Sequence, residues 1–241
     1  AVVARQVGPF QRESFLATTV EDIRSAAGFF FDTAYGMKSV SDYYSTFSRI
    51  AEFSPLLSKG YHRVAFVGTP CQIQAIRKMQ TLGIYPSDSI KVCLGLFCSG
   101  NFNFGDKQRN QIAKIGGFQW EHVRKINIKE DLLVHLEKGG VVSIRLDDLQ
   151  FIKRHACNFC ADFAAEYADI SFGGLGADEG WTTVIARSPA GARILSDSKD
   201  TAIEEYRPKA RSDLPSQALK RVRLWSDRKK KAALANRKRL V

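Results

Sequence analysis

The chain has 241 residues, of which 44% are hydrophobic and 25% are charged, and its formal net charge is +11. This composition is typical of a globular protein with a sizeable core. It contains no unbroken apolar run of about 18 residues, so no transmembrane helix is predicted. The N-terminus lacks the charged-then-apolar pattern of a signal peptide, so we expect a cytoplasmic protein.

The first residues predict two short strands followed by a helix. AVVA (1–4) and FLATT (15–19) are strand-like, and AVVA reads as a strand already under way, so we expect the domain to begin upstream. Thr19 is a good N-cap for a helix that starts with acidic residues. An apolar face at helical spacing predicts a further helix over 39–51.

A strand–turn–helix unit follows in "RVAFVGTPCQIQAIRKM". Residues 64–67 form a short apolar run of the buried-strand type, 68–70 form a turn, and 72–80 continue as a helix. A second strand, IKVCLGLFC (90–98), again ends in a cysteine and a loop. This alternation predicts an α/β fold with a mixed, partly parallel sheet and flanking helices.

The second half adds a small β-rich insertion and two more strands. Residues 118–150 are predicted to form short strands with a hairpin at Gly139-Gly140. ADISFGG (168–174) and WTTVIARS (181–188) are predicted strands around a glycine loop, and 190–198 is a predicted helix. We expect residues 1–206 to form one domain.

The last residues, 207–241, are predicted to be a linker over 207–216 and then a basic C-terminal helix. Residues 217–241 hold ten Lys or Arg and a single acid, Asp227. Such a helix can be a solvated terminus or a docking element for a partner, and it can also meet nucleic acid or a membrane surface. No nucleic-acid recognition motif accompanies the charge, so we expect no nucleic-acid partner.

Four of the five cysteines stand where their sulfurs can converge. Cys71 and Cys98 each follow a predicted strand, and the carboxyl ends of parallel strands meet at one edge of a sheet. Cys157 and Cys160 form a C-x-x-C pair. Cys93 lies inside a strand, at an odd offset from Cys98, and is predicted to be a buried core thiol.

Several chemistries suit four such thiols. Disulfides are disfavoured in a chain of this size without a secretion signal. Structural zinc takes four thiolates, but its modules usually carry two tight pairs. A [4Fe–4S] cluster also takes four thiolates and is favoured here because two of the ligands are single cysteines at distant strand ends. Redox thiols or core cysteines are the remaining alternative.

Glycine-rich turns could bring the backbone close to a cofactor. The segment 173–176 (GGLG) lies between two predicted strands. The turns 68–70 and 26–28 likewise lie at the end of a predicted strand or helix. The simpler interpretation is that these glycines only make turns. Neither a G-x-G-x-x-G nor a P-loop pattern is present, which disfavours a standard dinucleotide or nucleoside triphosphate site.

These segments together resemble the beta subunit family of coenzyme F420-reducing hydrogenases and F420-linked dehydrogenases. The resemblance rests on "IRSAAG", "FVGTPCQIQAIRK", "LGLFCSGNF" and "RHACNFCADFAAEYADISFGGLGADEGWTTVIARSPAG". It covers residues 1 to about 200. The Pro-Cys-Gln turn, the second strand-end cysteine and the C-x-x-C-x-D segment are specific in combination.

The resemblance implies an archaeal electron-transfer subunit that binds FAD and one [4Fe–4S] cluster and exchanges a hydride with coenzyme F420, in methanogenesis or a related metabolism, within a larger complex of partner subunits. It implies that the cluster ligands are Cys71, Cys98, Cys157 and Cys160. The flavin contacts that it implies are Ala27, Gly28, Gly68, Thr69, Pro70, Gln72, Gly173, Gly174 and Gly176. Lys153, Arg154 and Arg187 are candidates for contacts with the anionic groups of F420.

The sequence departs from the family pattern in two places. A Gly-Gly segment that normally lies upstream is absent, and the usual Ala-Ala-Gly-x-Lys-Tyr reads AAGFFFDTAYG, so a basic contact is missing or relocated. Two alternatives stay open beside the F420 oxidoreductase. One is a ferredoxin-dependent reductase of the same family, and the other is a non-catalytic scaffold subunit stabilised by zinc or a cluster.

Overall fold

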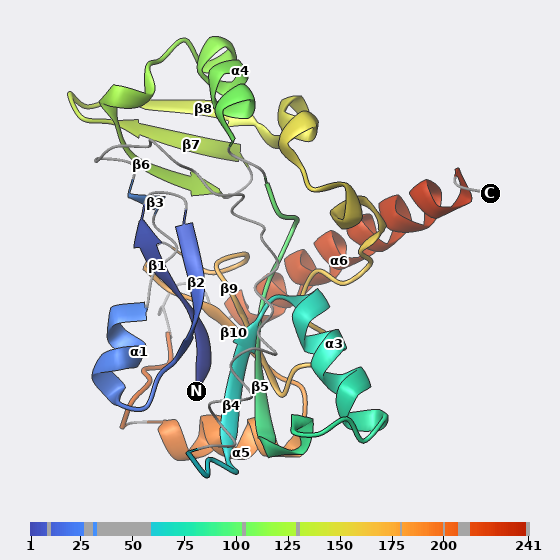
Figure 1. The fold of residues 1–241 in the computed structure, drawn as a ribbon. Coiled ribbons are helices and arrows are strands. Elements are labelled where there is room, and N and C mark those ends of the chain that lie inside the picture. Colours follow the sequence, from blue (N-terminus) through green and yellow to red (C-terminus); the bar gives the residue numbers. More distant parts are fainter. Residues whose placement is uncertain are drawn as a thin grey trace. The chain divides into compact units, whose positions relative to one another are not determined.

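The computed structural model describes residues 1–8, 11–26, 31–32, 59–102, 105–128, 131–178, 180–199, 201–206 and 213–239 (Figure 1). Two compact units divide the chain. Unit 1 comprises residues 1–2, 50–99 and 158–241, and unit 2 comprises residues 3–49 and 100–157. The predicted helix over 39–51 and the turn residues Ala27 and Gly28 lie outside the described residues.

The larger sheet is mixed and partly parallel, as predicted. Its strand order is β10-β9-β5-β4-β1-β2. β4 is parallel to β1 and β5, β5 is parallel to β9, and β10 is antiparallel to β9. Its strands are β1 (Val2–Gly8), β2 (Gln11–Leu16), β4 (Val64–Gly68), β5 (Ile90–Leu96), β9 (Ile170–Gly173) and β10 (Thr183–Ala186).

The helices of unit 1 follow from local signals in the sequence. α3 (Pro70–Thr81) connects β4 to β5 and begins with a proline, which suits the first turn of a helix. α5 (Pro189–Ser198) is capped by Ser188, whose Oγ accepts the Gly191 N–H at 3.1 Å. α6 (Leu214–Lys238) is the predicted basic helix, and it begins within the predicted linker. The short 3₁₀ helices η2 (Ser87–Ser89) and η5 (His155–Phe159) complete the list, η5 running into unit 1 from unit 2.

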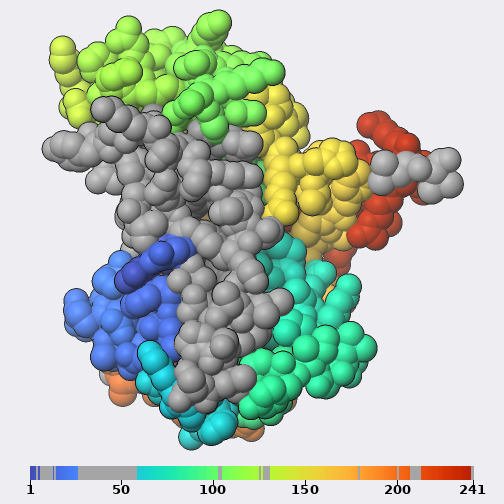
Figure 2. Space-filling model, viewed as in Figure 1, coloured from blue at the N-terminus to red at the C-terminus, as the bar shows by residue number. Residues whose placement is uncertain are grey.

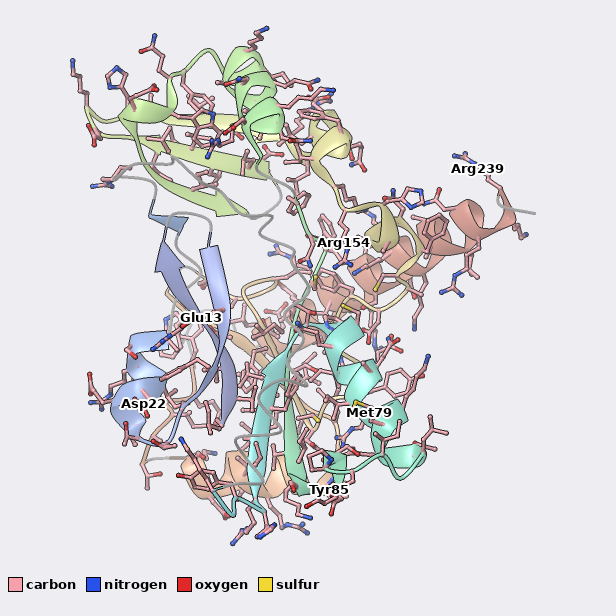
Figure 3. The ribbon with its side chains drawn as sticks, viewed as in Figure 1. Glu13, Asp22, Met79, Tyr85, Arg154 and Arg239 are labelled. Atoms are coloured by element: carbon pink, nitrogen blue, oxygen red, sulfur yellow. The ribbon has the colours of Figure 1, made fainter. Side chains whose placement is uncertain are left out.

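The core of unit 1 lies between the sheet and these helices. Alternate residues of β4 are buried, and Ile73 and Ile76 of α3 pack inward. Directly after α3 the side chains are exposed to solvent, with Leu82 73% exposed and Tyr85 68% exposed, whereas Ser87 and Ser89 of η2 are buried. Parts of this stretch form the surface in Figure 2, and Figure 3 labels Tyr85.

Unit 2 is built on a four-stranded antiparallel sheet in the order β3-β6-β7-β8. The hairpin at Gly139-Gly140 is confirmed, since it joins β7 to β8 with φ of 88° and 94° at the two glycines. A core of Ile112, Ile126, Leu132 and other apolar residues lies against this sheet. The elements are β3 (Phe31–Asp32), β6 (Val123–Ile128), β7 (Asp131–Leu136), β8 (Val141–Arg145), α1 (Val20–Ala26), α4 (Asp106–Gly116), η3 (Trp120–His122) and η4 (Leu146–Ile152).

Two features of unit 2 bear on the sequence predictions. The Thr19 cap is confirmed, because its Oγ1 accepts the Asp22 N–H at 3.1 Å. Helix α4, by contrast, was not predicted from the sequence. Its inward face has only two buried residues, Arg109 and Ile112, so its apolar periodicity is weak. None of the helices that the structure describes has the length and apolarity of a membrane span.

Candidate functional site

The carboxyl ends of three parallel strands of unit 1 define the candidate site. β4 and β5 are in register at Gly68↔Gly95, and β5 and β9 are in register at Leu96↔Phe172. The segments that follow these strands therefore start at the same edge of the sheet, which is the edge where open α/β sheets bind ligands. These segments contain the predicted turn 68–70 with Cys71, the pair Phe97-Cys98, and the glycine loop 173–176.

The first segment is ordered by the start of α3. The Gln72 side-chain oxygen accepts the Thr69 backbone N–H at 2.9 Å, as in a capping box. The hydroxyl of Thr69 lies 3.3 Å from the sulfur of Cys71, which is exposed in the first turn of the helix. Gln72, a predicted flavin contact, therefore has a capping role of its own.

The second and third cysteine segments of unit 1 are joined by hydrogen bonds. The Cys98 N–H donates to the Phe163 carbonyl at 2.8 Å. The Cys160 thiol lies 3.6 Å from the carbonyl of Asp162. The ammonium of Lys229 bridges the two segments, because it donates to the carbonyls of Cys98 at 2.6 Å and Asp162 at 2.8 Å.

Asp162 also connects helix α3 to the Cys98 and Cys160 segments. Its side chain is buried and accepts a hydrogen bond from Gln74 Nε2 at 3.2 Å. Gln74 is three residues beyond Cys71, so the two residues share a face of α3. The helix that carries Cys71 and the segments that carry Cys98 and Cys160 are thus linked by direct contacts.

Cys157 belongs to unit 2. Its sulfur accepts the Asn101 N–H at 3.3 Å, and its own N–H donates to the Arg154 carbonyl at 2.9 Å. A backbone N–H directed at sulfur is a feature that stabilises metal-bound thiolates.

Cys93 is buried in β5, as predicted. It pairs with Phe66 across the sheet and has no exposed surface. Burial raises the pKa of its thiol to about 11. A thiol of this kind remains protonated at neutral pH and acts as a packing residue.

The donor set suits a metal group in its chemistry. All five cysteines are free thiols, and the four predicted ligands are partly or fully exposed, unlike Cys93. Among the residues that the structure describes, no group of three or more His, Cys, Asp or Glu is close enough to hold a metal ion. The four-cysteine ligand set therefore stays a prediction.

The predicted flavin-contact glycines divide into two kinds. A Cβ at Gly173 would lie 2.0 Å from Phe97, one at Gly176 would lie 2.8 Å from Ala218 of α6, and one at Gly68 would lie 2.6 Å from Phe66. These three glycines make room for other parts of the protein. A Cβ at Gly174 would meet nothing within 4 Å, so this position alone of the four opens onto free space.

Arg187 and Trp181 both have contacts with other residues of the protein. The Arg187 guanidinium donates to Ser171 Oγ at 2.6 Å and to the Ala164 carbonyl at 3.0 Å, so this candidate for an anion contact already has internal partners. Trp181 stacks on Tyr206 with their ring centroids 4.4 Å apart.

Asp169, at the opposite end of β9, is the most heavily bonded carboxylate described in unit 1. It accepts the Cys93 N–H and the Arg77 guanidinium, both at 2.8 Å, and the Ser188 hydroxyl at 2.7 Å. Burial alone would raise the pKa of Asp169, but these donors outweigh burial and lower it below its ordinary value. Through this network, one side chain bonds to β5, to α3 and to the residue that caps α5. It lies at the end of β9 opposite the candidate site.

Sequence reasoning missed the role of α6 at the site. The helix packs Val222 and Trp225 against Phe163 and Phe97, beside Cys98. Small or apolar residues recur every four positions along its inner face, which is the signal that could have shown that the helix is packed; they are Leu214, Ala218, Val222 and Ser226.

Comparison with known proteins agrees with this architecture. Residues 61–211 match the family model for the C-terminal part of the coenzyme F420 hydrogenase/dehydrogenase beta subunit. The chain is 30% identical over 193 residues to a coenzyme F420 hydrogenase subunit beta of Methanococcus voltae, covering 79% of this chain and 64% of that protein. It is also 30% identical over 220 residues to the corresponding subunit of Methanothermobacter thermautotrophicus, covering 86% of this chain and 71% of that protein.

A solved structure shares the fold. A chain in a structure of the F420-reducing [NiFe] hydrogenase complex from Methanosarcina barkeri superimposes with a TM-score of 0.70 at 26% identity, over 94% of this chain and 77% of that one. The chain spans about two thirds of the length of the curated relatives named above. The chain belongs to the coenzyme F420 hydrogenase/dehydrogenase beta subunit family.

Proposed function

We propose that this chain is the F420-handling electron-transfer subunit of an oxidoreductase complex and that it uses FAD and one [4Fe–4S] cluster. Family membership supports an F420-linked oxidoreductase subunit. The observation that carries the proposal is the set of contacts that links α3, the Cys98 segment and the Cys160 segment at the carboxyl edge of the sheet.

The residues that would hold the cluster are Cys71, Cys98, Cys157 and Cys160, and the loop around Gly174 would meet the flavin. When bound, FAD exchanges a hydride with F420 and single electrons with the cluster, which is why a two-electron donor and a one-electron carrier need it between them. Partner subunits would receive or supply these electrons.

The surrounding residues of unit 1 have physical roles in this scheme. The N-terminal turn of α3, which contains Cys71, carries the positive end of the helix dipole and favours a negatively charged group there. Lys229 adds a full positive charge beside the Cys98 and Asp162 carbonyls. Phe97, Phe163 and Trp225 pack beside these segments and restrict the access of water to them.

Anaerobic purification of the chain, with analysis of flavin, iron and acid-labile sulfide, tests the cofactors. We expect one FAD and four iron atoms per chain. Separate Cys→Ser changes at the four predicted ligands should abolish iron binding, while Cys93→Ala should retain it. Zinc without flavin would support the scaffold alternative and contradict the proposal.

The substrate is tested by mixing the reconstituted protein with F420 or with a ferredoxin. We expect bleaching of the F420 absorbance with an artificial electron acceptor or donor. Oxidation of ferredoxin without any reaction of F420 would favour the ferredoxin-dependent alternative.

A further inference from the structure

Helix α6 donates hydrogen bonds to backbone carbonyls on both sides of Cys160 and to that of Cys98. Three side chains make these bonds, and each lies on the face of the helix that meets the rest of unit 1. The contacts are Lys229 Nζ to Cys98 O (2.6 Å) and Asp162 O (2.8 Å), Asn236 Nδ2 to Asn158 O (2.9 Å), and Arg237 Nη2 to Phe159 O (2.9 Å). Figure 1 shows α6 running beside this stretch of chain.

Two of these carbonyls need partners from outside their own helix. Asn158 and Phe159 are the last residues of η5, and the final carbonyls of a helix have no partner within it. Asn236 and Arg237 donate to these carbonyls. Lys229 donates to the carbonyls of Cys98 and Asp162, which are 64 positions apart in the chain. Its ammonium group therefore holds these two segments next to each other.

The rest of the helix fixes the register of these donors. Ala218 packs against Gly176, and the absence of a side chain at Gly176 leaves room for Ala218. Val222 is 3% exposed and packs on Phe163. Next to Lys229 in the sequence, Lys230 pairs with Glu166 at 2.6 Å. Because the helix is anchored along its length, the backbone that carries Lys229 is held beside these carbonyls.

We propose that α6 is a positioning element for the cofactor thiols and that Lys229 is its central residue. It holds the Cys98 and Cys160 segments together through the Cys98 and Asp162 carbonyls, and its charge would offset the negative charge of thiolates that bind the proposed cluster. The inference rests on the proposed function for the identity of the bound group. It assigns the basic helix a role inside the subunit, whereas its composition alone also suits a solvated terminus or a docking helix.

The first test measures amide hydrogen exchange in the full chain without added cofactor. Lys229→Met keeps the length of the side chain and removes its charge, and Lys229→Arg keeps the charge. Lys231→Met is the matched control, because Lys231 is exposed on the same helix. We expect exchange in peptides covering 97–99 and 158–163 to be at least tenfold faster in Lys229→Met than in Lys231→Met, with Lys229→Arg in between. Equal exchange in the two Met variants would overturn the proposal.

A second variant, Asn236→Ala, tests the segment around Cys160 independently of the segment around Cys98. Asn236→Ala removes only the donor to the Asn158 carbonyl. We expect faster exchange around residues 157–160 and no change at 97–99. This variant keeps the test decisive if Lys229→Met fails to fold, which circular dichroism and the melting temperature will show. Unchanged exchange around 157–160 would count against α6 as a positioning element.

The second test follows cluster binding after anaerobic reconstitution with ferrous iron and sulfide. We expect Lys229→Met to bind less than half of the wild-type iron, with a changed electron paramagnetic resonance signal and a more negative reduction potential. Lys229→Arg should restore iron content, and Lys231→Met should match the wild type. Faster exchange in Lys229→Met together with wild-type iron content and potential would show a purely structural helix and overturn the proposal.

The two tests distinguish the inference from the proposed function. If the wild-type chain takes up no iron, the proposed function fails, while the exchange experiment still decides whether α6 positions the thiol segments.

Discussion

Replacing Asp169 with Asn tests how much the charge of this buried carboxylate stabilises unit 1. The carboxylate accepts three hydrogen bonds, from the Cys93 N–H, the Arg77 guanidinium and the Ser188 hydroxyl. An asparagine oxygen in the place of Oδ2 keeps the first two bonds as neutral-acceptor bonds. The amide NH₂ group then faces Ser188, whose hydroxyl can turn and accept. The shape and most of the bonds survive, and the charge is lost.

The magnitude follows from the loss of charge assistance. Hydrogen bonds to charged groups contribute about 1.5–3 kcal/mol and neutral ones about 0.5–1.5 kcal/mol, so losing the charge costs about 1 kcal/mol for each of the two bonds that Oδ2 accepts. The ion pair with Arg77 is the same contact as the hydrogen bond from its guanidinium and is partly screened, because the Arg77 side chain is 30% exposed, so it adds no separate amount. The sum is about 2 kcal/mol, or a melting temperature lower by about 4–8 °C for a protein of this size.

Calorimetric unfolding of the wild type, Asp169→Asn and Asp88→Asn measures this difference. Asp88 is an exposed acid before β5, and its substitution should cost no more than about 0.5 kcal/mol. Asp169→Ala, which leaves the buried Cys93 N–H without a partner, should be more destabilising than Asp169→Asn. If Asp169→Asn and Asp88→Asn have the same melting temperature, the reasoning about this network is refuted.

Three further predictions concern single residues. Because its pKa is lowered in the fold, Asp169 stabilises the protein above its unfolded-state pKa of about 3.9, and this stability is lost as pH falls through the lower folded-state value; Asp169→Asn should flatten the acid limb of stability against pH. At pH 8 and with a pKa of about 11, Cys93 is about 0.1% thiolate, so iodoacetamide followed by mass spectrometry should label Cys71 within minutes and leave Cys93 unlabelled until the protein unfolds; equal rates would contradict its burial. Gly140→Ala should cost about 1 kcal/mol in urea unfolding because φ is 94° there and no atom is near, whereas Gly174→Ala, which lacks a positive φ and is equally open, should cost less than half of that.

The strand–turn–helix unit around Cys71 could be predicted because its signals are local. An apolar run marks β4, and a Thr-Pro pair marks the start of α3, where a proline is favoured. The hairpin at Gly139-Gly140 was predictable for the same reason, since both residues adopt the positive φ that glycine tolerates. The position of Cys93 followed from strand alternation alone.

The contacts that shape the candidate site were not predictable in this way. Lys229 meets the Cys98 carbonyl across 131 positions of sequence, and no local pattern marks such a pair. The glycines present the same difficulty. The sequence does not show that a side chain at Gly173 would collide with Phe97, or that one at Gly176 would collide with Ala218 of α6.

The long separation between the cysteine segments and α6 has a consequence for biosynthesis. Lys229 is translated 67 residues after Asp162 and 131 after Cys98. At 5–20 residues per second, the ribosome needs about 3–13 s to travel from Asp162 to Lys229. The segments around Cys98 and Asp162 are therefore synthesised seconds before the side chain that bonds to both of their carbonyls, and they gain this contact only once α6 has been made.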